Sequence, residues 1–428
     1  MDFLENSLDK EYRDEFVNFI YKAVNDFGDL FIIEKDNLKI IDYDSFNSFF
    51  EVKKDFTDFK RVEDLKNKVL NLKLKNIKDF KYEIKRNEKA KIRSIGLTIE
   101  TKPDWAMKEH CLEALEYACT RFEVGVQTLD ENCLRKTNRG HSLDDTKKAF
   151  AIMKDMCFKI NAHMMLGLPA SNLKIDEDSL INLFEDENYR PDMLKIYPCL
   201  VVVGTPLYKM WELGLFKPID TKLAAQIIAR AYRYFPKYLR VMRVQRDIPT
   251  NLVNGGIENS NLREFVDKEM LKEGIESKDI RAREVGLRQI KGYKLKDFKL
   301  NVEKYNSSGG LDYFIEAIDE NDTLLGFIRL RFPGSFGLIS QIDEKTALIR
   351  ELHIYGQTAI VGEKISEKLQ HRGWGKKLLE KAEEIAKENS YTKMAIISGV
   401  GVREYYRKFG YDLDGPYMMK NLSSKNSI

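Results

Sequence analysis

Gln370-His-Arg-Gly373-Trp-Gly375 lies between a strand-like run at residues 346–354 and an amphipathic, helix-like run at residues 376–389. Glycines at such a turn expose backbone N–H groups where a helix begins. These unpaired groups and the positive end of the helix dipole attract a pyrophosphate. Because an ordinary glycine turn before a helix has the same pattern, the flanking segments decide how this stretch is interpreted.

The flanking segments have the alternation of a sheet that is covered by helices. An apolar stripe along the helix-like run consists of Leu378, Leu379, Ala382, Ile385 and Ala386. Such a stripe is typical of a helix packed on a sheet. Residues 313–318 and 324–331 predict a hairpin before it, residues 393–398 a further strand, and residues 399–411 a short tyrosine-bearing helix that is stopped by a glycine. This order resembles the GNAT acetyltransferase fold, and the resemblance implies that the glycine turn holds the pyrophosphate of acetyl-CoA.

Longer motifs extend the resemblance over most of the chain. Arg350-Glu-Leu-His353-Ile-Tyr-Gly, Asn138-Arg-Gly-His141 and His163-Met-Met-Leu-Gly-Leu-Pro169 look like segments of the catalytic subunit of Elongator. Similar runs lie at residues 96–104, 123–127, 192–198, 243–249, 370–379 and 401–417. That family acts on the wobble uridine of tRNA and joins a radical-SAM domain to an acetyltransferase domain. The resemblance is loose before about Arg86.

The resemblance implies an α/β chain in which a partial radical-SAM-type (β/α) barrel precedes a GNAT acetyltransferase domain. Alternating patterns agree, because strand–helix repetition predicts a parallel sheet with helices outside. Strand-like runs lie at residues 94–99, 121–127, 159–165, 193–197 and 238–244, and helix-like runs at 107–118, 143–156, 179–184 and 221–234. The expected domains are an N-terminal helical segment (1–92), the partial barrel (93–236), a linker that contacts tRNA (237–300) and the acetyltransferase domain (301–428).

The carboxyl ends of parallel strands meet at one mouth, where a barrel binds its ligands. Glu100, Gln127, His163 and Lys195 are expected there. In the family this mouth holds SAM and its cluster, so these four residues form the rim of a residual SAM site. A purely structural role for Glu100 and Gln127 is equally compatible with the sequence.

Cysteine usage departs from the family pattern. A [4Fe–4S] cluster that leaves one iron for SAM needs three closely spaced thiolates. The five cysteines, Cys111, Cys119, Cys133, Cys157 and Cys199, include no C-x-x-C pair. The resemblance implies that the family's cluster loop would precede Met1. We therefore expect no cluster and no SAM chemistry in this chain, and buried thiols in a reducing compartment.

A second departure lies at the positions that match the family's structural zinc ligands. Ser277, Asp279 and Ala282 stand where the family carries cysteines. Serine and alanine are poor or impossible zinc ligands, and one aspartate cannot hold the ion. We expect no bound metal here. Two origins explain both departures equally well: a specialised natural relative, or a family member that was deliberately shortened and mutated.

Charge and hydropathy limit the possible partners. With a net charge of +3, an RNA site must be a local patch. No apolar run is long enough to cross a bilayer and no signal peptide is present, so the sequence predicts a cytoplasmic protein without a membrane partner. Arginines at strand spacing can place guanidinium groups against phosphates, although a salt-bridged sheet face would look the same. The candidate tRNA contacts are Arg233, Lys237, Arg240, Arg243 and Arg246, with a weaker group at Arg135, Lys136 and Arg139.

The acetyltransferase half predicts specific roles. The backbone of Gln370, His371, Arg372, Gly373, Trp374, Gly375 and Lys376 should bind acetyl-CoA, and so should the strand that contains Glu351, Leu352 and His353. A departing CoA thiolate needs a proton donor, which a tyrosine near the start of the following helix supplies. Tyr406 and Tyr405 are the two candidates, with Tyr406 preferred. His353 could position substrate or water, or be a core residue.

These inferences lead to two hypotheses. The first is an acyltransferase that binds tRNA and acetyl-CoA, cleaves the thioester, and passes the acetyl group to an acceptor or to water. Carboxymethylation would then depend on a partner that supplies the radical step. The alternative is a catalytically silent tRNA-binding relative with a structural CoA pocket. A second copy of the chain or Elongator-type accessory subunits are further candidate partners.

Overall fold

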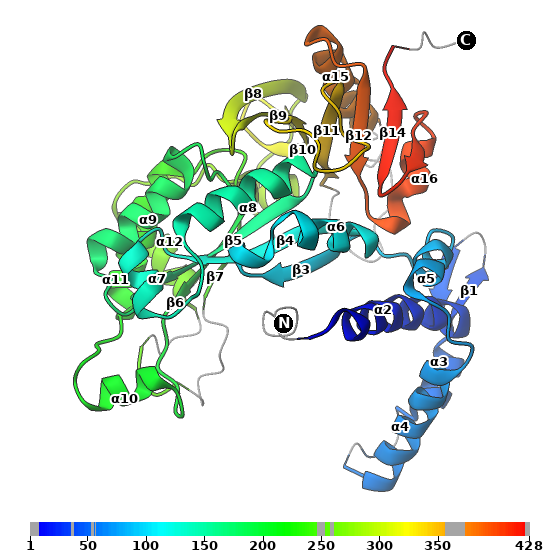
Figure 1. The fold of residues 1–428 in the computed structure, drawn as a ribbon, viewed down its shortest axis with the longest axis horizontal. Helices are drawn as coiled ribbons and strands as arrows, with labels where there is room; N and C mark the ends of the chain where they lie inside the picture. The colour runs from blue at the N-terminus through cyan, green and yellow to red at the C-terminus, as the bar shows by residue number, and fades with distance from the viewer. Residues whose placement is uncertain are drawn as a thin grey trace. The chain divides into compact units, whose positions relative to one another are not determined.

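The computed structural model describes residues 8–35, 38–52, 55, 57–245, 253–256, 261–355 and 373–423 (Figure 1). These residues divide into two compact units. The first unit comprises Met1–Ile99, Leu112–Thr120 and Ser398–Met418, and the second comprises Glu100–Cys111, Arg121–Ile397 and Met419–Ile428. Each unit is described by itself.

Helices dominate the first unit. Its elements are α2 (Lys10–Phe31), β1 (Ile32–Lys35), β2 (Leu38–Ile41), α3 (Tyr43–Phe50), α4 (Phe59–Leu74), α5 (Phe80–Asn87), η5 (Val400–Val402), α16 (Arg403–Arg407) and β13 (Asp412–Asp414). Asp9 begins α2 by accepting the N–H of Tyr12, as a helix N-cap does. The β1–β2 hairpin was not expected from the sequence, which predicted a helical segment here.

The core of the first unit brings together the two ends of the chain. Tyr21 of α2 and Ile84 of α5 pack in one apolar cluster with Val400. A Cβ on Gly399 would lie 2.0 Å from the carbonyl oxygen of Ile95, so only glycine fits this close approach. An ion pair between Arg403 and Glu88, at 2.5 Å, adds a long-range charged contact.

The second unit contains the expected parallel sheet, with strand order β3-β4-β5-β6-β7. Its strands are β3 (Leu97–Thr101), β4 (Cys119–Gln127), β5 (Lys159–Leu166), β6 (Met193–Pro198) and β7 (Arg240–Val244). The associated helices are η1 (Pro103–Trp105), α6 (Lys108–Glu116), α7 (Glu131–Lys136), α8 (Leu143–Asp155), α9 (Leu173–Glu185), α10 (Pro206–Glu212), α11 (Thr221–Ala231), η2 (Tyr232–Tyr234) and α12 (Leu262–Lys272). Among the described residues this sheet stays open, so the barrel is partial, as predicted.

A second sheet contains the strands expected for the acetyltransferase domain, with strand order β14-β12-β11-β10-β9-β8 in this unit. Its elements are α13 (Ile280–Arg283), α14 (Val285–Ile290), β8 (Lys299–Ser307), β9 (Gly310–Ile318), β10 (Leu324–Phe332), β11 (Thr346–Ile354), α15 (Trp374–Glu388), β12 (Lys393–Ile397) and β14 (Tyr417–Asn421). The pairs from β8 to β11 are antiparallel, whereas β11 and β12 run parallel. Helix α15 packs on β9, β10 and β11 through its buried stripe.

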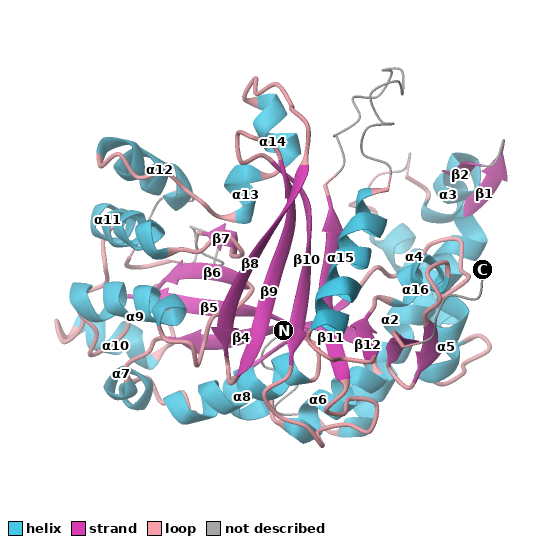
Figure 2. Cartoon of the chain, turned by 90° about the horizontal axis from the view of Figure 1, so that it is seen from above, coloured by secondary structure: helices cyan, strands magenta, loops and turns pink. Residues whose placement is uncertain are grey.

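Buried charges join the two sheets of the second unit, which Figure 2 shows in magenta. Asp192, just before β6, accepts two hydrogen bonds from Arg350 of β11, at 2.7 and 2.5 Å. Lys154 of α8 lies 3.2 Å from Asp312 of β9, and all four of these side chains are almost wholly buried. Burial lowers the pKa of Lys154 to about 8, although Asp312 opposes this.

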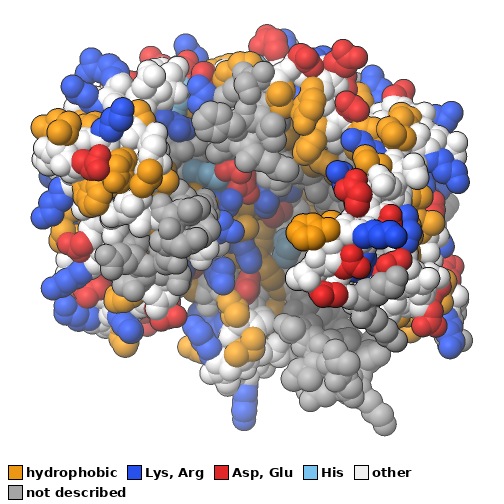
Figure 3. All heavy atoms as spheres, turned by 90° about the horizontal axis from the view of Figure 1, so that it is seen from below, with side chains coloured by type: hydrophobic (Ala, Val, Ile, Leu, Met, Phe, Trp, Pro, Cys, Tyr) orange, Lys and Arg blue, Asp and Glu red, His pale blue; other side chains and the backbone are white. Residues whose placement is uncertain are grey.

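Charged side chains of both signs are mixed over the face shown in Figure 3. In Figure 3, Lys and Arg alternate with Asp, Glu and apolar side chains over the visible face. This distribution agrees with 71 basic and 68 acidic residues in the chain, and it requires any anion site to be local. Among the described helices, none combines the length and the apolar composition that a membrane span requires.

Candidate functional site

The glycine turn forms the start of α15, in the second unit. Gly373 has a φ of 93°, in the left-handed region, and no side chain caps the helix. The N–H of Lys377 donates to the carbonyl of Gly373 at 3.0 Å, so the N–H groups of residues 374–376 precede the helical ladder. The turn therefore presents uncapped amides at the positive end of a helix of 15 residues. Gln370, His371 and Arg372 lie outside the described residues.

Side chains around the turn anchor it. Trp374 is buried and lies 6.2 Å from Phe298, ring to ring. The Lys377 ammonium lies 4.2 Å from the centroid of the Trp374 ring. Lys376 is exposed and lies 3.5 Å from Glu380, one turn along the helix. Trp374 therefore fixes the start of the helix to the sheet, and the backbone of residues 373–376, including Gly375, keeps no side-chain cap.

Strand β11, which is predicted to bind acetyl-CoA, contains a bulge. Arg329 of β10 pairs with Glu351, but Leu330 pairs with Ile349, so Arg350 is an extra residue in β11. Glu351 accepts a hydrogen bond from Arg329 Nε at 2.9 Å. Burial raises the pKa of Glu351, but the charge of Arg329 outweighs it and lowers that pKa. Glu351 is thus an ionised partner of Arg329. Leu352 continues the regular ladder opposite Ile328.

His353 lies on β11 among aromatic rings. Its imidazole stacks on Phe327 at 5.9 Å and lies 4.4 Å from the Tyr355 ring. Loss of hydration lowers the pKa of His353, and Arg240 lowers it further, although Glu351 opposes them. The ring is therefore neutral at pH 7, with one nitrogen able to accept a proton.

The two candidate proton donors belong to the first unit, on the short helix α16. Tyr406 is 6% exposed and lies 6.2 Å from Tyr411, ring to ring. Tyr405 is half-buried and packs on Phe409 at 5.0 Å. Burial raises the pKa of Tyr405, so this phenol keeps its proton at neutral pH.

Two residues of the predicted SAM-site rim, His163 and Lys195, pair with Glu123, which the prediction did not assign to the rim. His163 lies 3.2 Å from Glu100 and 3.0 Å from Glu123. Lys195 also forms an ion pair with Glu123. Burial raises the pKa of Glu123, but His163 and Lys195 outweigh it and lower that pKa to about 2. Gln127 ends β4 with a φ of 71° and a buried Oε1 that has no hydrogen-bond partner.

Most of the predicted RNA-contacting side chains already have acidic partners. Arg233 lies 3.0 Å from Glu273, Lys237 lies 3.0 Å from Asp322, and Arg240 lies 3.0 Å from Glu284. Arg240 also donates to the hydroxyl of Tyr355. Arg243 is exposed, and Arg246 lies outside the described residues.

A bulge nevertheless brings two of the arginines to one face of β7. Arg240 is opposite Met193 and Arg243 is opposite Lys195, so Met242 is an extra residue in the ladder. Residues two apart in a regular strand point to the same face. Because Met242 is an extra residue, Arg240 and Arg243 point to the same face although they are three positions apart. The predicted common face of Arg240 and Arg243 therefore exists.

The positions that match zinc ligands contain a hydrogen-bonded carboxylate. Asp279 is fully buried and accepts from Ser277 Oγ at 2.6 Å and from the N–H of Val241 at 3.2 Å. It also caps α13 by accepting the N–H groups of Arg281 and Ala282, both at 3.3 Å. With its oxygens engaged and no thiolate beside it, this residue set does not fit zinc.

Cysteine placement does not fit an iron–sulfur cluster either. All five cysteines are buried and free of disulfides. Within the described part of the chain, the only group of three or more potential metal ligands is Glu100, Glu123 and His163, which contains no thiol. Because Lys195 already neutralises Glu123, that group is an internal ion-pair cluster.

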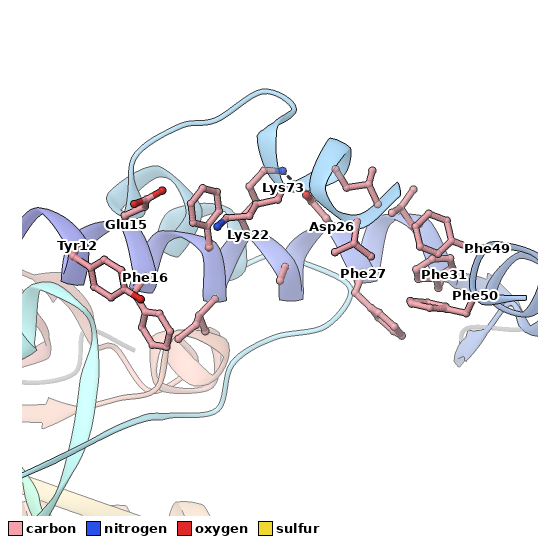
Figure 4. Close-up of a pocket in the computed structure, with 16 residues that line it drawn as sticks. Tyr12, Glu15, Phe16, Lys22, Asp26, Phe27, Phe31, Phe49, Phe50 and Lys73 are labelled. Atoms are coloured by element: carbon pink, nitrogen blue, oxygen red, sulfur yellow. Dashed lines mark hydrogen bonds and ion pairs between the residues drawn. The ribbon is translucent and has the colours of Figure 1, made fainter. Parts of the chain in front are cut away.

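The first unit also has an apolar pocket of about 540 Å³ between α2, α3 and α4. Figure 4 shows Phe31, Phe49 and Phe50 grouped at one end of it. The Phe49 and Phe50 ring centroids lie 4.9 Å apart. Two acidic and two lysine side chains line the pocket, so its charge is balanced and it does not favour an anion.

Comparisons with known proteins agree with this architecture. Residues 62–179 match the Radical SAM superfamily, residues 191–272 the Radical_SAM C-terminal domain, and residues 283–411 the Acetyltransferase (GNAT) family. The solved structure of the archaeal Methanocaldococcus infernus Elp3 with an N-terminal deletion (1–46) superposes with a TM-score of 0.76. It is 41% identical in sequence and covers 80% of this chain and 82% of its own.

Curated relatives are similar over a shared region. Elongator complex protein 3 of Danio rerio is 41% identical over 79% of this chain, and 62% of the relative is covered. The tRNA uridine(34) acetyltransferase of Methanocaldococcus jannaschii is 43% identical over 78% of this chain and 63% of its own length. The chain thus spans a little under two thirds of the length of these relatives.

Proposed function

Because the chain belongs to the Elongator catalytic-subunit family, we propose that it binds tRNA and acetyl-CoA and takes part in modifying the wobble uridine of tRNA. The proposed chemistry is acyl transfer, in which the thioester of acetyl-CoA is cleaved and the acetyl group passes to an acceptor or to water. The GNAT match and the relatives named tRNA uridine(34) acetyltransferase support this proposal.

One observation carries the proposal for acetyl-CoA. Gly373 adopts a left-handed conformation at the uncapped start of α15, and the bulged strand β11 belongs to the same unit. Free amides at a helix N-terminus bind pyrophosphate oxygens, and the αL glycine lets the backbone turn without a side chain in the way. The exposed Lys376 adds positive charge beside the turn.

The proposed step uses residues of this chain for binding and proton transfer. A nucleophile adds to the acetyl carbonyl, the carbon–sulfur bond breaks, and the sulfur leaves with the electron pair. Tyr406 donates a proton to that thiolate, with Tyr405 as the second candidate. When water is the nucleophile, the neutral imidazole of His353 accepts its proton.

The radical half of the family reaction is not assigned to this chain. Its described cysteines do not gather into a set of three thiolates, so no proposed step uses a cluster or SAM. Carboxymethylation would then depend on a partner that supplies the radical chemistry. A second copy of the chain or Elongator-type accessory subunits are the proposed partners.

Release of free CoA from acetyl-CoA, with and without unmodified tRNA, tests the proposal. The purified chain should release CoA faster when tRNA is present. tRNA binding without any release would overturn the catalytic part and favour a silent tRNA-binding relative. Absence of both binding and release would overturn the proposal as a whole.

A further inference from the structure

The second unit contains an open cleft of about 1080 Å³ next to β7. The residues that line it come from β7, α12, α13, α14, the segments that flank these elements, and the turn before β10. Eight lysines and arginines line the cleft, against three acidic residues. In a chain with nearly equal numbers of basic and acidic residues, this cleft is a local positive patch.

Part of this charge is already neutralised. Arg263 pairs with Asp267 at 2.8 Å. Lys237 and Arg283 both pair with Asp322, at 3.0 and 2.9 Å. These contacts engage two of the three acidic residues that line the cleft.

The other cations of the cleft come from β7 and from residues 278–291. Lys278, Arg281 and Lys291 are exposed, and no described carboxylate lies within ion-pair distance of them. Arg243 is also exposed and comes from β7. Arg288 donates to the carbonyls of Ala282 and Asn321, at 3.3 and 2.9 Å, rather than to a carboxylate.

A buried carboxylate fixes the loop that carries two of these cations. Asp279 lies between Lys278 and Arg281 and accepts the N–H of Val241 in β7. The N–H of Ile280 also donates to the carbonyl of Leu239, at 2.8 Å. The loop is therefore held to β7 before any ligand arrives, which reduces the entropy lost on binding.

An aromatic ring distinguishes this cleft from a simple phosphate site. Tyr293 is 47% exposed, and the guanidinium of Arg288 lies 4.7 Å from its ring centroid. Met242 and Leu287 add apolar lining. Spaced cations beside an exposed ring and a planar guanidinium are what unpaired nucleotides require, because phosphates follow the charges and bases stack on the planar groups.

We propose that this cleft binds an unpaired segment of RNA, with its phosphates along Lys278, Arg281 and Lys291 and a base stacked on Tyr293. The inference rests on the proposed function, because tRNA supplies the RNA. It moves the RNA contact from the salt-bridged Arg233 and Arg240 to a cleft that includes residues of the α13–α14 region.

Binding of a fluorescent ten-nucleotide uridine RNA to the full chain tests the inference. A duplex RNA of equal length and an acidic poly-glutamate peptide serve as competitors. Lys278→Glu/Arg281→Glu should weaken binding more than tenfold and reduce the salt slope by about 1.4, the value for two lost single-strand phosphate contacts. Lys209→Glu/Lys217→Glu is the charge-matched control, because both lysines are exposed and lie outside the cleft. This control should bind as wild type does.

Stacking has its own test. Tyr293→Ala should weaken binding of the single strand roughly tenfold, a loss at the low end of that for one stacked base, whereas Tyr293→Phe should retain it. Circular dichroism of each variant verifies folding. Equal affinity for duplex RNA, or displacement by poly-glutamate as effective as by RNA, would overturn the inference.

The two proposals fail in different ways. If wild-type chain binds tRNA but the cleft variants bind it equally well, the cleft assignment is wrong and the proposed function stands. If wild-type chain binds no RNA and releases no CoA, the proposed function itself is wrong.

Discussion

Replacing Arg350 by methionine should lower the free energy of unfolding of the second unit by about 3–5 kcal/mol, the range for breaking a buried ion pair. The guanidinium is fully buried and donates two hydrogen bonds to Asp192 and one to the carbonyl of Phe158. Burial opposes the charge of Arg350, but Asp192 and Asp312 outweigh it and raise its pKa well above the usual value. The substitution would leave Asp192 charged, buried and short of its main partner.

Lys393→Met is the matched control. Lys393 pairs with Asp343 at 2.6 Å, close to the 2.5 Å between Arg350 and Asp192. Both side chains of the Lys393–Asp343 pair, however, are nearly half exposed. Removing such a surface pair costs only about 0–1 kcal/mol, because water replaces the lost partner. The double variant Arg350→Met/Asp192→Asn should recover part of the loss, because it also removes the stranded charge while the amide oxygen can still accept from Ile160.

Urea denaturation followed by tryptophan fluorescence provides the assay. All three tryptophans, Trp105, Trp211 and Trp374, belong to the second unit, so their emission reports that unit alone. The free energies come from the linear dependence on urea concentration. If Arg350→Met cost no more than Lys393→Met, the buried pair would not stabilise the junction between the two sheets.

Three further predictions address the sites. Gly373→Glu should weaken CoA binding more than tenfold by placing bulk and negative charge at the pyrophosphate turn; Gly373→Ala, which adds only the strain of a left-handed residue, should weaken it less, and an equal loss would implicate strain instead. Tyr406→Phe should slow thioester cleavage about 100-fold with little change in the Kd for CoA, whereas Tyr405→Phe should be close to wild type; equal loss of rate and binding would indicate packing. Because the pKa of Glu123 is about 2 instead of 4.5, its contribution to stability is present above pH 4.5 and lost as pH falls toward 2. Glu123→Gln should flatten that part of the pH–stability curve, and an unchanged slope would contradict the assignment.

Local patterns in the sequence predicted most elements of the second unit. Strand β11 has the predicted bounds, and α8 and β5 differ by one residue at an end. Strand β8 was missed because it is mostly exposed and lacks the apolar alternation that marks a half-buried strand. Helix α9 begins six residues before the predicted start, at a cap formed by Asn172.

The candidate sites were harder to predict wherever residues meet across strands. The sequence placed His163 and Lys195 near one another, but it gave no reason to single out Glu123, since pairing across 40 and 72 residues is set by the fold. The cleft cations Lys278 and Lys291 do not form a charge run in the sequence. They come together only because α13 and α14 turn back beside β7.

The composition of the first unit also sets an order of events during synthesis. Its core needs Val400, and its ion pair with Glu88 needs Arg403, yet about 300 residues separate this C-terminal segment from α5. At roughly 5–20 residues per second, a ribosome needs roughly 15–60 s to translate that interval. During this time α2 and α5 lack part of their apolar cover, so the nascent chain passes through a stage in which chaperones have an exposed surface to bind.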